Sequence, residues 1–322
     1  MSGVSKLVAA AFLCSALPIA AVAQSFPSKP VRIVVPYEPG GAVDILARAV
    51  SPKMSEDFGQ PVVIENRGGA GGRIGADIVA RSSPDGYTFM LTVGATHILN
   101  MFTQKNLPYH PIKDFTPITS AADTVLSVAA AASFPVSSIK ELIEHAKRNP
   151  VAYGTTSVGG LTHLTMEQVQ MLSGVKMTHV PYKGGGPLST NLVGGQIPLA
   201  AMPLAALMPH IRTGKVKVLA IVLSRRYGGL PDVPTLAESV PGFQNLDASG
   251  TWAFGPAGLP APIVQRIRSA LVAALYVPET RSKIESGGQI VVGNSTREFT
   301  EQIARLADFG GKLVKAIGFK PQ

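Results

Sequence analysis

The chain has 322 residues and a single cysteine, and its 29 Lys and Arg residues outnumber its 20 Asp and Glu residues, for a formal net charge of +9. This length suffices for two modest domains, and one cysteine excludes disulfides within the chain and clustered thiolate metal sites. Because the sequence has no run of clustered Lys or Arg, the positive charge favours attraction of small anions over binding to nucleic acid.

The first 23 residues predict an export signal peptide. Lys6 supplies the positive region, residues 7–20 form a mostly apolar stretch, and the small residues at 21–23 fit a cleavage site. We therefore expect cleavage after Ala23 and a mature chain that begins at Gln24, outside the cytoplasm.

The only cysteine, Cys14, lies within this leader. The mature chain would therefore contain no thiol. Lipid attachment at Cys14 is disfavoured because Leu13 is bulky where such signals carry a small residue. Pro18 also breaks the apolar stretch, which is too short to span a membrane.

Short apolar runs and helical patterns alternate at the start of the mature chain. Residues 31–35, 62–64 and 87–93 are typical of strands. Between the first two, apolar residues recur at helical spacing: Ile45, Leu46, Ala49, Val50, Met54 and Phe58. This order predicts a parallel sheet with helices on both faces.

The same rhythm continues in a second block. Further strands are expected at residues 125–130, 153–155, 177–180, 199–201, 216–222 and 252–254. Helices are expected from a cap at Ser137 or Ser138 to about residue 149, and over residues 161–173, 263–275 and 299–316. No low-complexity linker separates the blocks, so we expect two α/β lobes joined by several chain crossings.

Glycine-rich turns between a strand and a helix start are the candidate binding segments. The turn over residues 36–44 contains Tyr37, Pro39, Gly40, Gly41 and Asp44. Glycine lets backbone amides approach a ligand, and the helix start that follows offers unpaired N–H donors for an anion. Asp44 fits a helix-stabilising acid better than a ligand contact, since it lies in the first helical turn.

Two more turns have the same chemistry. Residues 155–163 add hydroxyl groups, and their candidate ligand contacts are Thr156, Ser157, Gly159, Gly160, Thr162 and His163. A capped helix start would explain the same pattern, but two such turns in two lobes favour binding. In the third turn, Lys183 would add a point charge beside Gly184.

Catalytic and cofactor sites find little support. The segment over residues 69–75 resembles a dinucleotide loop, but its last spacing is one residue too long, and close helix packing explains it better. The six histidines show no paired metal spacing. No nucleophile-elbow sequence surrounds Ser157 or His163. We expect no enzyme, no cofactor and no metal. With 6% aromatic residues and a single tryptophan, a sugar receptor is also disfavoured.

Several short motifs follow one another in an order typical of one family. They are Phe26-Pro27-Ser28-Lys29-Pro30-Val31-Arg32, the Pro-Gly-Gly-x-x-Asp turn at residues 39–44, Glu65-Asn66-Arg67, Pro84-Asp85-Gly86-Tyr87-Thr88, His163-Leu164, Tyr182-Lys183-Gly184, Leu230-Pro231-Asp232-Val233-Pro234-Thr235 and Gly255-Pro256-Ala257-Gly258. Over essentially its whole length the chain resembles the Bug family of tripartite tricarboxylate transporter solute receptors.

The resemblance implies a class II periplasmic-binding-protein fold of two lobes, each with a central sheet flanked by helices, that closes like a flytrap on its ligand. Residues 24–123 with 249–322 would form lobe one and residues 124–248 lobe two. Backbone amides and hydroxyls of both lobes would hold a small organic carboxylate, with Thr92 and Thr96 added to the contacts above.

The implied partners are the ligand and the membrane subunits of a tripartite tricarboxylate-type transporter, served by a monomeric periplasmic receptor without stable membrane insertion. A receptor that presents its ligand to a membrane sensor remains an alternative from another functional class.

The chain departs from the family pattern at Met202, near a position where many relatives carry an acid. An acid there could pair with a ligand amine, whereas methionine cannot. This departure predicts a carboxylate without an amino group, including bulkier or aromatic acids.

Overall fold

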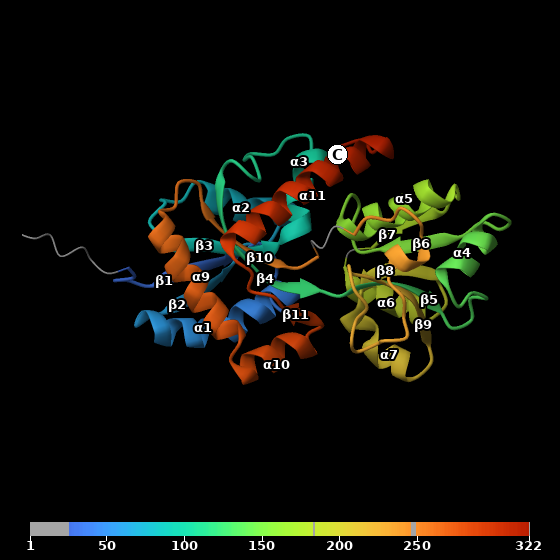
Figure 1. Cartoon of the computed structure of the whole chain (residues 1–322), viewed down its shortest axis with the longest axis horizontal. Helices are drawn as coiled ribbons and strands as arrows, with labels where there is room; N and C mark the ends of the chain where they lie inside the picture. Colours follow the sequence, from blue (N-terminus) through green and yellow to red (C-terminus); the bar gives the residue numbers. More distant parts are fainter. Residues whose placement is uncertain (1–25, 183, 246–248, 322) are drawn as a thin grey trace, which may run out of the picture.

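In the computed structural model, which describes residues 26–182, 184–245 and 249–321, the chain forms two β-sheets with helices on both faces of each (Figure 1). The predicted leader over residues 1–23, its cleavage site and Lys183 lie outside the described residues. The expected α/β architecture with two sheets is confirmed.

The first sheet has the strand order β11-β4-β10-β3-β1-β2. Its strands are β1 (Val31–Val35), β2 (Val62–Asn66), β3 (Thr88–Val93), β4 (Phe115–Thr124), β10 (Thr251–Pro256) and β11 (Gln289–Val291). Strands β1, β2 and β3 are parallel, and β10 runs antiparallel between β3 and β4. The sheet is therefore mixed, and the chain returns to it late in the sequence to insert β10.

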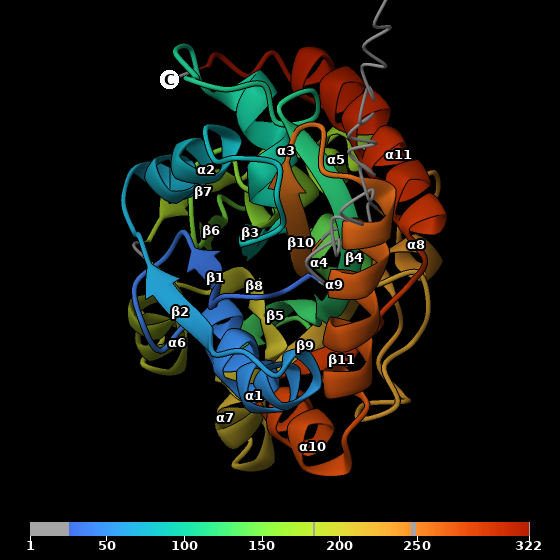
Figure 2. The same ribbon diagram turned by 90° about the vertical axis from the view of Figure 1, so that its left-hand side faces the viewer.

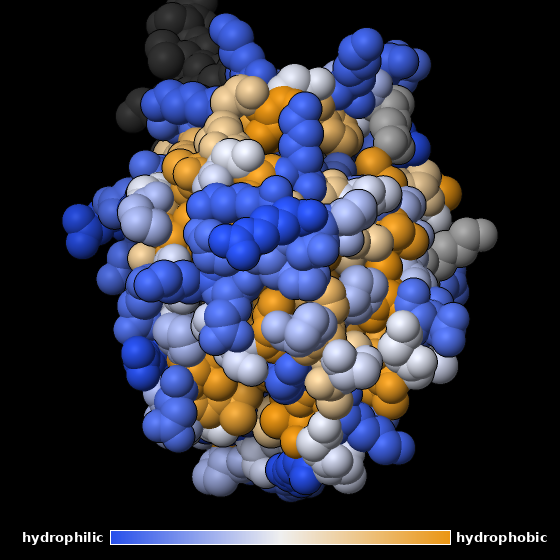
Figure 3. Space-filling model, turned by 90° about the vertical axis from the view of Figure 1, so that its right-hand side faces the viewer, coloured by the Kyte–Doolittle hydropathy of each residue, from blue (hydrophilic) through white to orange (hydrophobic). Residues whose placement is uncertain are grey.

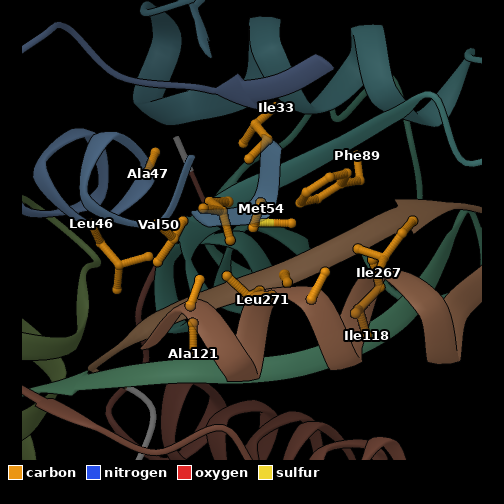
Figure 4. Close-up of a cluster of buried hydrophobic side chains, with 14 of the residues drawn as sticks. Ile33, Leu46, Ala47, Val50, Met54, Phe89, Ile118, Ala121, Ile267 and Leu271 are labelled. Atoms are coloured by element: carbon orange, nitrogen blue, oxygen red, sulfur yellow. The ribbon is translucent and has the colours of Figure 1, made fainter. Parts of the chain in front are cut away.

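Alternate residues of these strands enter two separate cores. Ile33 and Phe89 pack with Leu46 of α1 (Ala42–Phe58) and Leu271 of α9 (Ala261–Leu275), beside α10 (Pro278–Ser286) (Figure 4). The opposite face packs against α2 (Arg73–Ala80), which follows η1 (Ala70–Gly72), and against α3 (Gly94–Thr103) and α11 (Thr296–Ala316). Figure 2 shows these two groups of helices on either side of the sheet. The sheet thus buries both faces, as its continuous apolar strands predict.

The second sheet has the order β7-β6-β8-β5-β9. Its strands are β5 (Leu126–Ala131), β6 (Ala152–Thr155), β7 (Thr178–Pro181), β8 (Leu199–Pro203) and β9 (Val216–Val222). One face packs against α4 (Ile139–Ala146), α5 (Leu161–Ser173) and α8 (Leu236–Ser239). The other packs against α6 (Gly185–Val193), η2 (Leu204–Leu207) and α7 (Met208–Arg212).

The chain passes between the sheets at least twice. It leaves the first sheet where β4 ends at Thr124 and β5 begins at Leu126, and it returns after α8 to begin β10 at Thr251. Ser249 joins the two passages, because its hydroxyl donates to the backbone carbonyl of Thr124 at 2.6 Å. The C-terminal segment also spans the sheets, since the ring of Phe319 lies 6.0 Å from that of His163 in α5.

Two strands of the first sheet, β4 and β11, are absent from the sequence-based expectation. Pro117 lies within β4, where a proline normally argues against an inner strand. Pro117 pairs with Phe254 of β10, directly beside a shift in the register between β4 and β10, and this irregularity accommodates it. By contrast, the helix cap was predictable: Ser138 accepts a hydrogen bond from the backbone of Glu141 at 3.1 Å.

The molecular surface is mixed in character. Figure 3 views the molecule from the end formed by the second sheet and its helices, where apolar areas alternate with hydrophilic side chains. Such a mixture is ordinary for a folded protein, because apolar atoms make up more than half of most protein surfaces. Among the described residues, no helix combines the length and the apolar character needed to span a bilayer.

The buried histidine of α3 makes folding stability depend on pH. His97 is 2% exposed, and its Nε2 donates to the carbonyl of Pro111 at 2.9 Å. Burial lowers the pKa of His97 to about 4, whereas the unfolded chain takes up this proton near pH 6.5. The contribution of neutral His97 to the free energy of unfolding is therefore complete above about pH 6.5, and it is lost as the pH falls toward 4.

We expect the free energy of unfolding, measured with urea, to fall by on the order of 3 kcal/mol from His97 alone across that interval. His97→Gln keeps a donor for Pro111 but cannot titrate, so its stability should decline less steeply. His210→Gln serves as the control, and equal slopes in all three proteins would contradict the assignment.

Candidate functional site

A cavity of about 220 Å³ lies where elements of the two sheets meet. It is lined from the first sheet by Ala42, Val93, Ala95 and Thr96, from the chain passages by Thr124, Leu126 and Ser249, and from the second sheet by Thr156, Ser157, Leu161, Thr162 and Pro203. Larger surface grooves of about 340 to 520 Å³ lie beside α10, α11 and the loop after β9. The smaller cavity is the better candidate because helix starts from both sheets border it.

Three helices begin at this cavity. Residues of the first turns of α1, α3 and α5 line it, and the N-cap residues of these helices are Gly41, Val93 and Gly160. None of these three described residues makes a side-chain cap hydrogen bond. The first amides of a helix have no partner within the helix, and its N-terminus carries partial positive charge. The cavity therefore collects amide donors suited to an anion.

Hydroxyl groups supply further donors. Half of the lining residues are Thr or Ser: Thr96, Thr124, Thr156, Ser157, Thr162 and Ser249. The hydroxyls of Thr156 and Thr162 lie 3.4 Å apart. Among the lining residues that the structure describes, none carries a charge. The donors that the described lining offers to an anion are therefore neutral.

Four of the residues selected from the sequence line this cavity, namely Thr96, Thr156, Ser157 and Thr162. Gly41 and Gly160 directly precede lining residues as helix caps. Tyr37 lies behind the wall: its hydroxyl is 3.2 Å from the hydroxyl of Thr92 and accepts from the amide of Val93 at 3.3 Å. Burial raises the pKa of Tyr37, although these two bonds lower it. Through the bond to its amide, Tyr37 supports the lining residue Val93.

Asp44 holds the first turn together and does not line the cavity. It is 3% exposed and accepts from the Gly40 amide at 2.9 Å, from Arg48 Nε at 2.9 Å and from Asn66 Nδ2 at 3.0 Å. Burial would raise the pKa of Asp44, but the hydrogen bonds from Arg48, Gly40 and Asn66 outweigh it and lower the pKa. The Gly40 amide is therefore already engaged, and Pro39 is exposed.

His163 holds the second turn in the same way. Its Nδ1 accepts from the Gly159 amide at 3.0 Å, so the proton of the neutral ring lies on Nε2, which is 3.5 Å from Glu167. The interaction with His163 is the main cause of the lowered pKa of Glu167. His163 is thus a support for the turn that carries Thr156 and Ser157.

A second ring reinforces this support. His179 stacks on His163 with centroids 3.8 Å apart, and burial lowers the pKa of His179 to about 4. The hydroxyl of Thr155 donates to the carbonyl of Ser157 at 3.0 Å, which leaves its oxygen to accept from His179 Nε2 at 2.7 Å. The two stacked histidines therefore hold the turn at two points, His179 at Thr155 and His163 at Gly159.

The remaining selected residues lie away from the cavity lining. Gly184 has φ of +103° and precedes α6. Met202 is 0% exposed within the core beneath α6, whereas its neighbour Pro203 lines the cavity. Successive side chains of a strand point to opposite faces. The candidate Met202 therefore points into the core, and Pro203 is the residue of this strand that lines the cavity. Lys183 is outside the described residues.

Sequence reasoning missed Ala42, Val93, Ala95, Thr124, Leu126, Leu161, Pro203 and Ser249. Thr124 and Ser249 are separated by 125 positions and meet only because the chain passes twice between the sheets. Ala42 and Leu161 could have been found, because each is the first helical residue after a glycine turn.

The chain is similar to known proteins over most of its length. Residues 46–319 match the model of the tripartite tricarboxylate transporter family receptor, TctC. The chain is 32% identical to a UPF0065 protein of Bordetella bronchiseptica, over 98% of this chain and 93% of that protein.

Among solved structures, periplasmic binding protein BugD is 32% identical with a TM-score of 0.75, over 92% of this chain and 100% of that chain. Rpa4515 of R. palustris with adipate is 32% identical with a TM-score of 0.79 and the same coverage. BugD is a periplasmic binding protein, and the similarity to it confirms the expected fold class.

The turn-holding role of His163 leads to a stability prediction. His163→Leu should lower the free energy of unfolding by about 1 to 3 kcal/mol, because the buried Gly159 amide loses its acceptor. His163→Asn, whose Oδ1 can take the place of Nδ1, should recover much of that loss in urea unfolding. Equal losses in both variants would show that ring packing matters and the acceptor does not.

Proposed function

The chain belongs to the tripartite tricarboxylate transporter receptor family, and we propose that it captures a small organic carboxylate in the cavity between its sheets for a transporter of this type. The observation that carries the proposal is the meeting of three uncapped helix starts from both sheets at one hydroxyl-lined cavity. Such a site offers several donors and no competing negative charge among its described lining residues.

The relatives support this chemistry. The related Rpa4515 was solved with adipate, a carboxylate. The formal net charge of +9 of this chain adds a favourable field for anions approaching from solution. The partners would be the ligand and the membrane subunits of the transporter.

The two sheets provide a means of closure. We assign residues 24–123 and 249–322 to lobe one and residues 124–248 to lobe two. Thr124, Leu126 and Ser249 belong to the passages between the sheets and also line the cavity. A rotation about these passages would separate the donors of α1 and α3 from those of α5, so that the lobes release a ligand when they part.

The proposal includes export to the periplasm, with signal peptide cleavage after Ala23, and action as a monomer through binding without catalysis. The apolar stretch and small residues of the leader support the export. The periplasmic solved relatives support the compartment.

The proposal is tested by a thermal-shift screen of protein that has been unfolded and refolded to remove carried-over ligand. The panel contains mono-, di- and tricarboxylates, amino acids and sugars. A ligand at 100 times its dissociation constant stabilises the folded state by about 2.7 kcal/mol, a clear rise in Tm. Stabilisation by sugars alone, with none by any carboxylate, would overturn the proposal.

The hydroxyl donors should be essential for affinity. Thr156→Val and Thr162→Val keep the side-chain shape but remove one donor each, and a hydrogen bond to a charged group is worth about 1.5 to 3 kcal/mol. We therefore expect the dissociation constant to rise about 10- to 100-fold in isothermal titration.

Thr165→Val is the matched control, because Thr165 lies in the same helix, is buried and does not line the cavity. Its affinity should stay unchanged. An equal loss of affinity in all three variants would place the ligand elsewhere.

A further inference from the structure

We infer that Phe319, in the segment after α11, is a positioning residue for the turn over residues 155–163 (the ligand turn) and holds this turn against the lobe of the first sheet. The inference rests on the proposed function, because it names a side chain on which carboxylate binding depends although that side chain does not line the cavity. Three observations carry it: the fixed backbone of Phe319, its contacts with the ligand turn and the apolar junction around it.

The end of α11 fixes the backbone of Phe319. Gly318 has φ of +63°, the left-handed conformation that glycine supplies at helix ends. The amide of Gly318 donates to the carbonyl of Lys315 at 3.1 Å, and the amide of Phe319 donates to the carbonyl of Val314 at 3.1 Å. These are the two hydrogen bonds of a Schellman motif. The direction in which residue 319 leaves the helix is therefore set by the backbone.

The ring of Phe319 lies against the ligand turn. Its centroid is 6.0 Å from that of His163, with the two planes at 69°, an edge-to-face arrangement in which aromatic rings attract. A Cβ atom placed on Gly159 would lie 3.0 Å from Cζ of Phe319 and 3.2 Å from Cβ of Thr103. His163 also stacks on His179 of the second sheet at 3.8 Å. The turn therefore meets α3 and Phe319 on the side of the first sheet.

An apolar junction surrounds this contact, where the end of α11 reaches α5 (Figure 1). Leu164 of α5 is fully buried in the apolar cluster of the first sheet, together with Leu313 and Val314 of α11. Phe319 packs against the same cluster. Leu161 packs against this cluster and against the core of the second sheet, and it also lines the cavity. Burial of apolar side chains from both lobes favours their contact, so separation of the lobes here would expose Phe319.

Phe319 acts on the ligand turn through His163. The Nδ1 of His163 accepts from the amide of Gly159 at 3.0 Å, and the lining residues Thr156 and Ser157 lie within the turn that this bond holds. A ring fixed at position 319 limits the movement of His163 and of Gly159 at once. The donors of the turn are thereby kept in place for a ligand.

The first test needs no ligand. Thr300→Cys in α11 and Lys140→Cys in α4 provide exposed sites for spin labels on the two lobes, in the chain from Gln24 onward, which has no other cysteine. Phe319→Ala should shift the distribution of label-to-label distances, measured by pulsed electron spin resonance, toward longer values. Hydrogen exchange at the Gly159 amide should become about three- to tenfold faster, the factor expected for loss of an aromatic contact.

Two substitutions at Gly318 test the geometry and leave the ring in place. A Cβ atom at Gly318 would meet no atom within 4 Å, so its positive φ alone restricts the residue. Asparagine tolerates this conformation, whereas a β-branched valine does not. Gly318→Val should therefore reproduce the effects of Phe319→Ala, and Gly318→Asn should keep the distances and the exchange rate of the wild type.

Phe26→Ala is the control for a general loss of packing, because the ring of Phe26 contacts Phe58 and Tyr87 within lobe one. It should lower Tm but leave the label distances and the exchange of Gly159 as they are. Equal changes in Phe26→Ala and Phe319→Ala, or no change in Phe319→Ala, would overturn the inference.

A second test measures affinity by isothermal titration with adipate, the ligand in the structure of Rpa4515, or with the panel carboxylate that stabilises the wild type most. The dissociation constant should be about three- to tenfold higher in Phe319→Ala and Gly318→Val than in the wild type and Gly318→Asn. An unchanged constant in Phe319→Ala would overturn the positioning role. Failure of the wild type to bind any carboxylate would overturn the proposed function, while the label distances and exchange rates would still decide whether Phe319 holds the turn.

Discussion

The unpaired amides at three helix starts are the constraint on which the site depends. The N-caps Gly41, Val93 and Gly160 provide no side-chain acceptor, so the amides behind them need water or a ligand as a partner. A hollow bordered by these helix starts meets that need with a single anion. The two-sheet architecture matters because it brings α1 and α3 of one sheet to α5 of the other.

Both glycine turns are held by the same local device. In the first, the Asp44 carboxylate accepts from the amide of Gly40 four positions earlier and is bonded to Arg48 four positions later. In the second, His163 accepts from the amide of Gly159 and approaches Glu167 with the same spacings. Gly40 and Gly159 also share a positive φ, of +88° and +70°. A side chain one helical turn inward therefore fixes each turn without entering the cavity.

The way in which these turns are held shows which features of the site the sequence could predict and which it could not. The helix starts and the hydroxyls of residues 156–162 followed from local glycine and hydroxyl patterns, because local patterns determine local turns. For Asp44 the position in the first helical turn favoured a helix-stabilising role over a ligand contact, whereas the role of His163 depended on where its side chain points. Met202 and Pro203 show the same difficulty within a strand, where a shift of one residue exchanges the core for the cavity. Thr124 and Ser249 required knowledge of the chain passages.

Neutral donors divided between two lobes also suit a protein that must release what it binds. A Lys or Arg would keep much of its attraction for a carboxylate after the lobes part, because the carboxylate could stay paired with it on the same lobe. Amides and hydroxyls contribute about 0.5 to 1.5 kcal/mol each when neutral and more toward a charged acceptor, and separation of the lobes removes part of the set at once. Each loss of about 1.4 kcal/mol weakens binding tenfold. In the proposed receptor, release would then follow from the separation of the lobes, which the passages at Thr124 and Ser249 connect.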